Sequence, residues 1–195
     1  MRELDVLSFV DRPWTYPSSK QIANSRQFVV NGVEFSLLLS NALDFETGAF
    51  TPLLDPSVNS ELDEQFLAAL LGSLPAENLR PGRVAVAFCS QCLDESCGEM
   101  VAIELRVDAQ TVTWSHIGYE EEHFGEFVPL RKRIFSRVKS IDPPEWWSPA
   151  PEPSGLSFTF DRAAYELVIE AEIARVRASP SERATGFARL RLGRK

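Results

Sequence analysis

Three cysteines are the residues best placed to do chemistry, because they lie within nine positions of a chain of 195 residues that has two histidines. Their spacing is Cys89-x-x-Cys92-x-x-x-x-Cys97. Three thiolates and one imidazole form a known tetrahedral zinc set. An odd number of clustered cysteines is unlike the disulfide framework of a secreted protein. The spacing therefore indicates a candidate zinc site with Cys89, Cys92 and Cys97 as ligands.

A histidine would be the fourth ligand, and the register of the hairpin that follows decides which one. If residues 109–110 form its tip, His116 pairs with Ile103 and faces inward like it. His116 then lies about six residues from Cys97, roughly 20 Å at 3.3 Å per residue, which is too far for a shared metal. The same register brings His123 close to Cys97. We therefore expect His123 to be the fourth metal ligand and His116 to be a packed side chain.

Three other interpretations of the cysteines stay open. Cys89 and Cys92 could form a redox pair, but such pairs sit at a helix N-terminus, whereas here a strand follows and residues 94–95 are acidic. Cys97 with His123 could form a catalytic dyad. The third interpretation is that the cysteines are buried structural thiols in a tight loop.

Short apolar segments predict the strands that must position this cluster. Asn31-Gly32 between apolar runs favours a two-residue hairpin turn. It would pair Val30 with Val33. One face would then carry Phe28, Val30, Val33, Phe35, Leu37 and Leu39. Similar alternation directs Trp114 inward. The expected strands are residues 27–39, 84–89, 99–107, 111–117 and 156–160.

Two helices are expected from apolar residues at helical spacing, over residues 60–72 and 161–178. Ser60 and Asp161 are the expected N-caps. The predicted fold class is therefore α+β, an antiparallel (meander) sheet with helices packed on one face.

The chain is expected to form a single globular domain over residues 1–195. Residues 142–155 hold five prolines, and we expect a proline-rich ordered loop there. Residues 181–195 would be a basic, mobile tail.

The net charge of −8, from 20 basic and 28 acidic residues, argues against a general nucleic-acid binder. No apolar run approaches the roughly 20 residues of a membrane span, and the N-terminus does not resemble a signal peptide. We therefore expect a cytoplasmic protein with no membrane partner. Neither a phosphate-binding glycine pattern nor a G-x-S-x-G elbow occurs, so the sequence assigns no catalytic or cofactor-binding residue.

Several segments together resemble a family of uncharacterised bacterial proteins, largely from actinobacteria. The family carries a C-x2-C-x4-C-G turn, a V-x-W segment and an F-x-F-D-R-x-x-Y-E helix start. Members often have Gly after the second cysteine, where this chain has Leu93. The resemblance covers residues 82–120 and 156–170, and it implies a common fold without a known activity. The segments that carry it are Gly82-Arg83-Val84, Cys89-x-x-Cys92 with Cys97-Gly98, Val112-Thr113-Trp114-Ser115, Gly118-Tyr119-Glu120 and Phe158-Thr159-Phe160-Asp161-Arg162-Ala163-Ala164-Tyr165-Glu166.

From these features we expect a non-enzymatic binding or interaction protein. Its basic tail and the Trp146-Trp147 pair motivate this hypothesis, which includes a homodimer formed through an aromatic or apolar surface. A small zinc-binding protein is the first alternative. An enzyme that uses the region of Cys97 and His123 is the second. The substrate, partner and process do not follow from the sequence.

Overall fold

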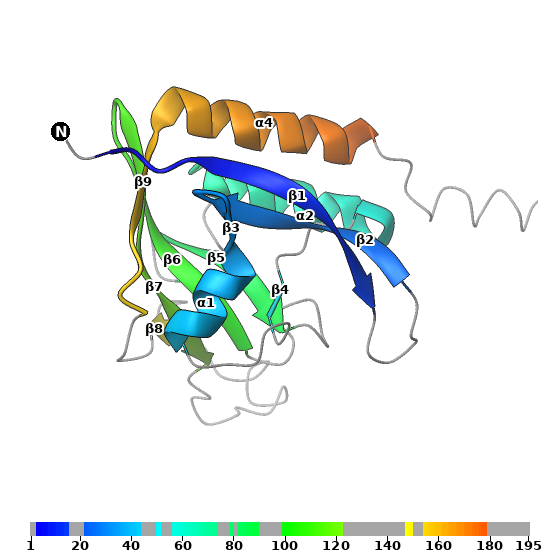
Figure 1. Cartoon of the computed structure of the whole chain (residues 1–195), viewed down its shortest axis with the longest axis horizontal. Helices are drawn as coiled ribbons and strands as arrows, with labels where there is room; N and C mark the ends of the chain where they lie inside the picture. The colour runs from blue at the N-terminus through cyan, green and yellow to red at the C-terminus, as the bar shows by residue number, and fades with distance from the viewer. Residues whose placement is uncertain are drawn as a thin grey trace, which may run out of the picture.

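The computed structural model has an α+β fold in which two antiparallel sheets pack with helices around one core (Figure 1). It describes residues 3–15, 22–43, 50–51, 56–73, 79, 82–89, 99–122, 147–149 and 154–178.

The small sheet consists of β1 (Leu7–Thr15), β2 (Ile22–Val30) and β3 (Val33–Glu34), in that order. Its second hairpin turns at Asn31 and Gly32, whose φ angles are 52° and 79°. Positive φ at both positions is what a two-residue hairpin turn needs, and Asn and Gly tolerate it. Val30 pairs with Val33, as the sequence predicts.

Helix α1 (Phe35–Leu43) replaces the strand that we expected to continue to residue 39. Phe35 and Leu39 are buried one helical turn apart, whereas Leu37 is 43% exposed. The prediction that these side chains share one buried face is therefore wrong for Leu37, whereas Val33 pairs with Val30 and is 38% exposed. A short run of leucines satisfies a period of 2 and a period of 3.6 equally well, which explains the error.

In the described part of the chain the large sheet has six strands, and three of them pair with β7. The order is β4-β5-β6-β7-β8, and β9 pairs with β7 beside β8. The antiparallel sheet expected from the sequence is confirmed, although residues 27–34 belong to the small sheet. The strands are β4 (Phe50–Thr51), β5 (Arg83–Cys89), β6 (Glu99–Val107), β7 (Thr111–Glu122), β8 (Trp147–Pro149) and β9 (Phe158–Asp161).

Helices α2 (Pro56–Leu70) and α4 (Arg162–Ala178) pack against each other beside the sheets. Ser60 is not the N-cap of α2, because the helix already begins at Pro56. Proline suits the first helical position, where no backbone N–H is needed. The other expected cap is confirmed, since Asp161 Oδ1 accepts a 2.9 Å hydrogen bond from the backbone N–H of Ala164.

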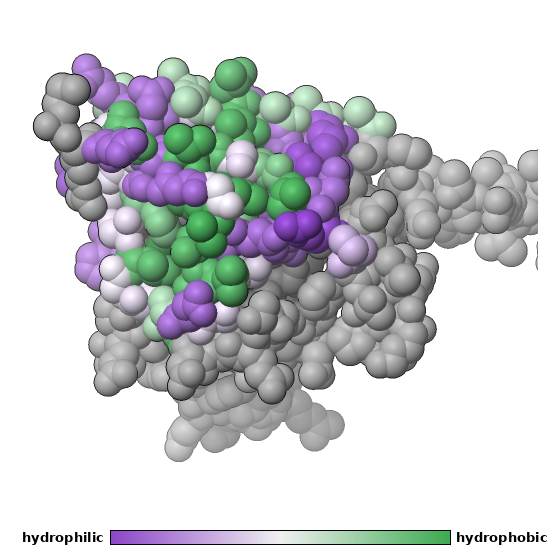
Figure 2. All heavy atoms as spheres, in the orientation of Figure 1, coloured by the Kyte–Doolittle hydropathy of each residue, from purple (hydrophilic) through white to green (hydrophobic). Residues whose placement is uncertain are grey.

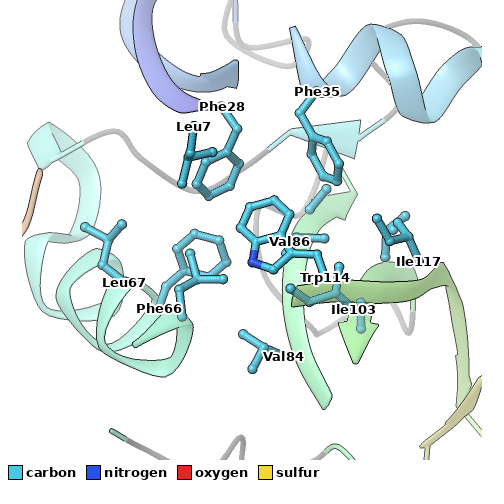
Figure 3. Packing of buried hydrophobic residues seen from close by; sticks show 14 of the residues in the cluster. Leu7, Phe28, Phe35, Phe66, Leu67, Val84, Val86, Ile103, Trp114 and Ile117 are labelled. Atoms are coloured by element: carbon cyan, nitrogen blue, oxygen red, sulfur yellow. The ribbon is translucent and has the colours of Figure 1, made fainter. Parts of the chain in front are cut away.

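Trp114 of β7 lies at the centre of the core, where side chains from both sheets, α1 and α2 meet (Figure 3). Its ring lies 5.7 Å from that of Phe28, 5.6 Å from that of Phe35 and 5.2 Å from that of Phe160. Edge-to-face aromatic pairs of this kind add about 0.5–1.5 kcal/mol each beyond the area they bury. The small sheet is thus anchored on the large sheet through aromatic rings.

Two of the predicted segments lie partly or wholly outside the described residues. In the proline-rich stretch, Trp147–Pro149 form β8, and the backbone N–H of Ser154 donates a 2.8 Å hydrogen bond to Ile117 O. Residues 142–146 and 150–153 of this stretch, and the basic tail 181–195, are outside the described part.

Candidate functional site

The cysteine cluster starts at the end of a well-defined strand. Cys89 is the last residue of β5, where its backbone pairs with Phe50. Cys92, Cys97 and His123, the other predicted zinc ligands, lie outside the described residues, as does the side chain of Cys89. Among the residues that are described, no group of three or more His, Cys, Asp or Glu side chains could hold a metal ion.

His116 does not face the core, so its predicted inward position is wrong. It has a φ of 46° and sits where the register between β6 and β7 shifts by one residue, which is a β-bulge. The bulge turns the His116 side chain outward and gives Ile117, which is fully buried, the inward position opposite Ile103. His116 Nδ1 lies 3.0 Å from a carboxylate oxygen of Glu104 at the surface.

A buried arginine of β5, which lies on the other side of β6, holds this bulge in place. Arg83 Nη1 donates a 2.8 Å hydrogen bond to the carbonyl oxygen of His116, and Nη2 donates to Ala102 O. Its Nε donates a 2.7 Å hydrogen bond to Glu120 Oε1, and Nη2 forms an ion pair with the same oxygen. The side chains of Arg83 and Glu120 are 6% and 0% exposed. The pair is therefore a structural element that joins β5, β6 and β7.

The Asn31 side chain has a second function besides its place in the hairpin turn. Its Oδ1 accepts a 2.8 Å hydrogen bond from the backbone N–H of Val6, and its Nδ2 donates a 2.7 Å bond to Asp5. Asp5 Oδ2 in turn accepts a 2.6 Å bond from the backbone N–H of Thr159 in β9. These bonds tie the start of β1 to the turn of the small sheet and to the large sheet.

A groove open to solvent lies on the small sheet beside the first turn of α1. Its volume is about 550 Å³. Alternation along β1 places Val10 and Arg12 on the face opposite Leu7, which is buried in the core. This sheet groove is lined chiefly by Val10, Arg12, Val29, Val33, Glu34 and Leu37.

Apolar side chains gather on this face of the molecule. Val33 and Leu37 are 38% and 43% exposed, and Val6, which directly precedes β1, is 65% exposed. Figure 2 shows apolar residues on the face that carries β1, β3 and α1, with hydrophilic residues around them. Exposed apolar patches of this kind are typical of interaction sites.

One ion pair provides the charge of the sheet groove. Arg12 Nε donates a 2.7 Å hydrogen bond to Glu34 Oε1, and the Arg12 and Glu34 side chains are 51% and 30% exposed. This hydrogen bond and the charge of Glu34 raise the pKa of the Arg12 guanidinium. The two opposite charges cancel, so the described lining of the groove carries no net charge.

The sheet groove was not predicted, although some of the sequence features that form it can be recognised. The Asn-Gly turn predicts the hairpin that forms one side of it, and Val6, Ser8, Val10 and Arg12 alternate along β1. Pro13 and Pro17 obscure this alternation, because proline cannot donate a backbone hydrogen bond and is rare within strands. The role of Leu37 required knowing that residue 35 begins a helix.

Comparison of the chain with protein-family models, with curated proteins and with solved structures finds no match in any of the three. No helix in the described part of the chain is long and apolar enough to cross a membrane. The function is therefore inferred from the residues and their geometry.

Proposed function

We propose that this protein is a non-enzymatic binding protein whose binding surface is the sheet groove. The observation that carries the proposal is the coincidence of a groove of about 550 Å³ with exposed apolar side chains, among them Val33 and Leu37. Exposed apolar surface is unfavourable in water, and its removal from water on binding contributes roughly 25 cal/mol per Å².

The rigid support of the groove is a second argument for binding. Its floor consists of strands whose other face is packed into the core through Leu7, Phe28 and Val30. The bonds of Asn31 to Val6 and Asp5 fix the hairpin end. A binding surface that is held in shape loses little conformational entropy when a partner docks.

The chemistry of the lining favours binding over catalysis. The lining has two ionisable side chains, Arg12 and Glu34, and they form an ion pair with each other. A general acid or base needs a group that can exchange a proton with a substrate at working pH. A raised pKa on an arginine moves that group further from such a role.

Site-specific photo-crosslinking in cells of the source organism tests this function. A photoreactive phenylalanine analogue would replace Leu37, and a control would carry it at Leu167, which is 68% exposed on α4. We expect a crosslinked species of discrete mass from position 37 only, identified by mass spectrometry. It should disappear when Val10→Lys is added, because the charge blocks the groove. The proposal fails if positions 37 and 167 give the same products.

Zinc binding by the cysteine cluster is a second candidate, favoured by one observation on the strands. Phe88 pairs with Met100, so Cys89 begins a connection between adjacent strands that also holds Cys92 and Cys97. Glu99 and Glu121 form the last observed pair at this end of β6 and β7. If the same register continued for two more residues on each strand, position 97 would pair with position 123. Three thiols and an imidazole brought together by this register would suit zinc.

Elemental analysis tests the zinc proposal directly. Protein purified without chelator should contain about one zinc per chain, and Cys92→Ser should lower that content by at least tenfold. Zinc below about 0.1 per chain in the unaltered protein would exclude this candidate. The enzyme alternative at Cys97 and His123 depends on the same register, and a Cys97→Ser variant with unchanged behaviour in all assays would remove it.

A further inference from the structure

We propose that the sheet groove is occupied by a second copy of this chain, in a two-fold symmetric dimer in which Arg12 of each copy faces the partner's Glu34. This inference deepens the proposed function and rests on it. It names the partner that the groove binds.

The charge pattern of the groove suits contact with a second copy of the same surface. Arg12 and Glu34 lie side by side at the groove and keep 51% and 30% of their side-chain surface exposed. A two-fold interface requires that each charge meets its opposite when the same surface is turned onto itself. A surface with one cation next to one anion can satisfy that requirement, whereas a surface with charges of a single sign cannot.

The apolar lining supports the same partner. Val10, Val29, Val33 and Leu37 form a surface without net charge on a chain whose overall charge is −8. A strongly charged partner would find nothing at the groove to select it. A second copy of the same surface offers matching aliphatic side chains together with a cation and an anion at matching positions.

A contact made through one groove and its rim is expected to be weak. Stable dimers bury about 800 Å² per partner, and smaller interfaces are weak or transient. Val6, which directly precedes β1 and is 65% exposed, would extend the contact beyond the groove lining. At physiological ionic strength the Debye length is about 8 Å, so the repulsion between two chains of charge −8 is largely screened. We expect a dissociation constant of the order of 10 μM.

Charge reversal in purified protein tests this arrangement, with sedimentation velocity as the measurement. The unaltered chain should shift from 21.9 kDa towards twice that mass as its concentration rises through about 10 μM. Arg12→Glu alone and Glu34→Arg alone should each weaken dimerisation by about tenfold or more, because like charges then face each other twice. An equimolar mixture of these two variants should restore the dimer, since an acidic copy then meets a basic one.

A matched control reverses a charge of the same kind elsewhere. Arg177 forms an ion pair with Glu64 between α4 and α2, and their side chains are 64% and 38% exposed. Arg177→Glu should leave dimerisation unchanged. Circular dichroism spectra and thermal midpoints of all variants would show that each one folds. The double variant with Arg12→Glu and Glu34→Arg should dimerise like the unaltered chain.

The outcomes separate this inference from the proposed function. A chain that stays at 21.9 kDa up to about 500 μM, roughly fifty times the expected dissociation constant, overturns the second-copy inference. In that case crosslinks from position 37 to a different protein would keep the groove as a binding surface, and no specific crosslink would overturn both. A dimer that survives both single reversals, or a mixture that fails to restore it, overturns the Arg12–Glu34 arrangement.

Discussion

Arg83 donates a hydrogen bond of 2.8 Å from Nη1 to the carbonyl oxygen of His116, the residue that bulges from β7. The same guanidinium is paired with the buried carboxylate of Glu120. A bulge frees a backbone carbonyl from regular pairing, and here the arginine of another strand satisfies it. Bulge and ion pair thus form one unit.

Arg83→Met should be strongly destabilising, because it leaves the carboxylate of Glu120 buried without its cation. Breaking a buried pair from one side costs about 3–5 kcal/mol. Urea denaturation would measure this loss in the free energy of unfolding. The double variant with Glu120→Leu removes both charges and should be more stable than Arg83→Met alone. A single variant that costs less than about 1 kcal/mol would contradict the role of the pair.

His116 should be replaceable by glycine but not by valine. Its φ of 46° lies in the left-handed region, which glycine adopts freely and a β-branched residue avoids. Because the side chain is exposed, His116→Gly should change stability by no more than about 1 kcal/mol. His116→Val should cost about 1–3 kcal/mol. Thermal denaturation of both variants compares them, and equal midpoints would argue against the bulge.

Tyr165 should make the protein less stable at high pH. Its hydroxyl donates to Leu70 O at 3.0 Å and accepts a 3.2 Å bond from Trp114 Nε1, and burial raises its pKa above the usual value of about 10. Above about pH 10 the unfolded chain therefore releases a proton that the folded chain keeps. The free energy of unfolding should fall as the pH rises through this range.

Tyr165→Phe provides the control for that pH dependence. Near neutral pH it should cost about 1–3 kcal/mol, because Leu70 O and the indole N–H of Trp114 lose their buried partner. The loss of stability above about pH 10 should become shallower, since the group responsible is gone. Urea titrations at about pH 8 and about pH 10.5 would measure both effects. An unchanged pH slope in the variant would contradict this assignment.

Asn31→Gly separates the role of Asn31 in the turn from its side-chain hydrogen bonds to the N-terminal segment. Glycine keeps the positive φ that the turn needs, so the loss should come from the bonds to Val6 and Asp5. We expect a cost of about 1–2 kcal/mol. Hydrogen exchange at the Val6 amide should become faster, while exchange at the amide of Phe28 in β2 should stay slow. Equal acceleration at both amides would indicate that the whole sheet is loosened instead.

The sequence predicted helices and strands well where the apolar residues fit only one period, either that of a strand or that of a helix. Residues 99–107 alternate cleanly, and the observed β6 has those bounds. Asp161 caps α4 as expected, since its carboxylate can satisfy a free N–H of the first turn. Residues 35–39 fit two periods, and the core contacts of Phe35 with Phe28 and Trp114 decide for the helix.

Features that depend on contacts between distant segments could not be predicted in the same way. The bulge at His116 depends on Arg83, which lies 33 residues earlier in the chain. Alternation within one strand gives no sign of such a partner. The predicted register therefore continued without a bulge through His116 and placed its side chain inward. The sheet groove likewise needs the packing of α1 beside β3, which alternation along one strand does not specify.

The bulge also has a consequence for how this chain tolerates changes in length. After it, odd-numbered residues such as Ile117 and Tyr119 face the core, whereas before it the even-numbered Val112 and Trp114 do. In a homologue that lacks position 116, strand β7 would continue without the bulge. Ile117 would still face inward, so the strand would lose a bend but no core contact. At any regular position of β7, a one-residue deletion would turn the following side chains to the wrong face.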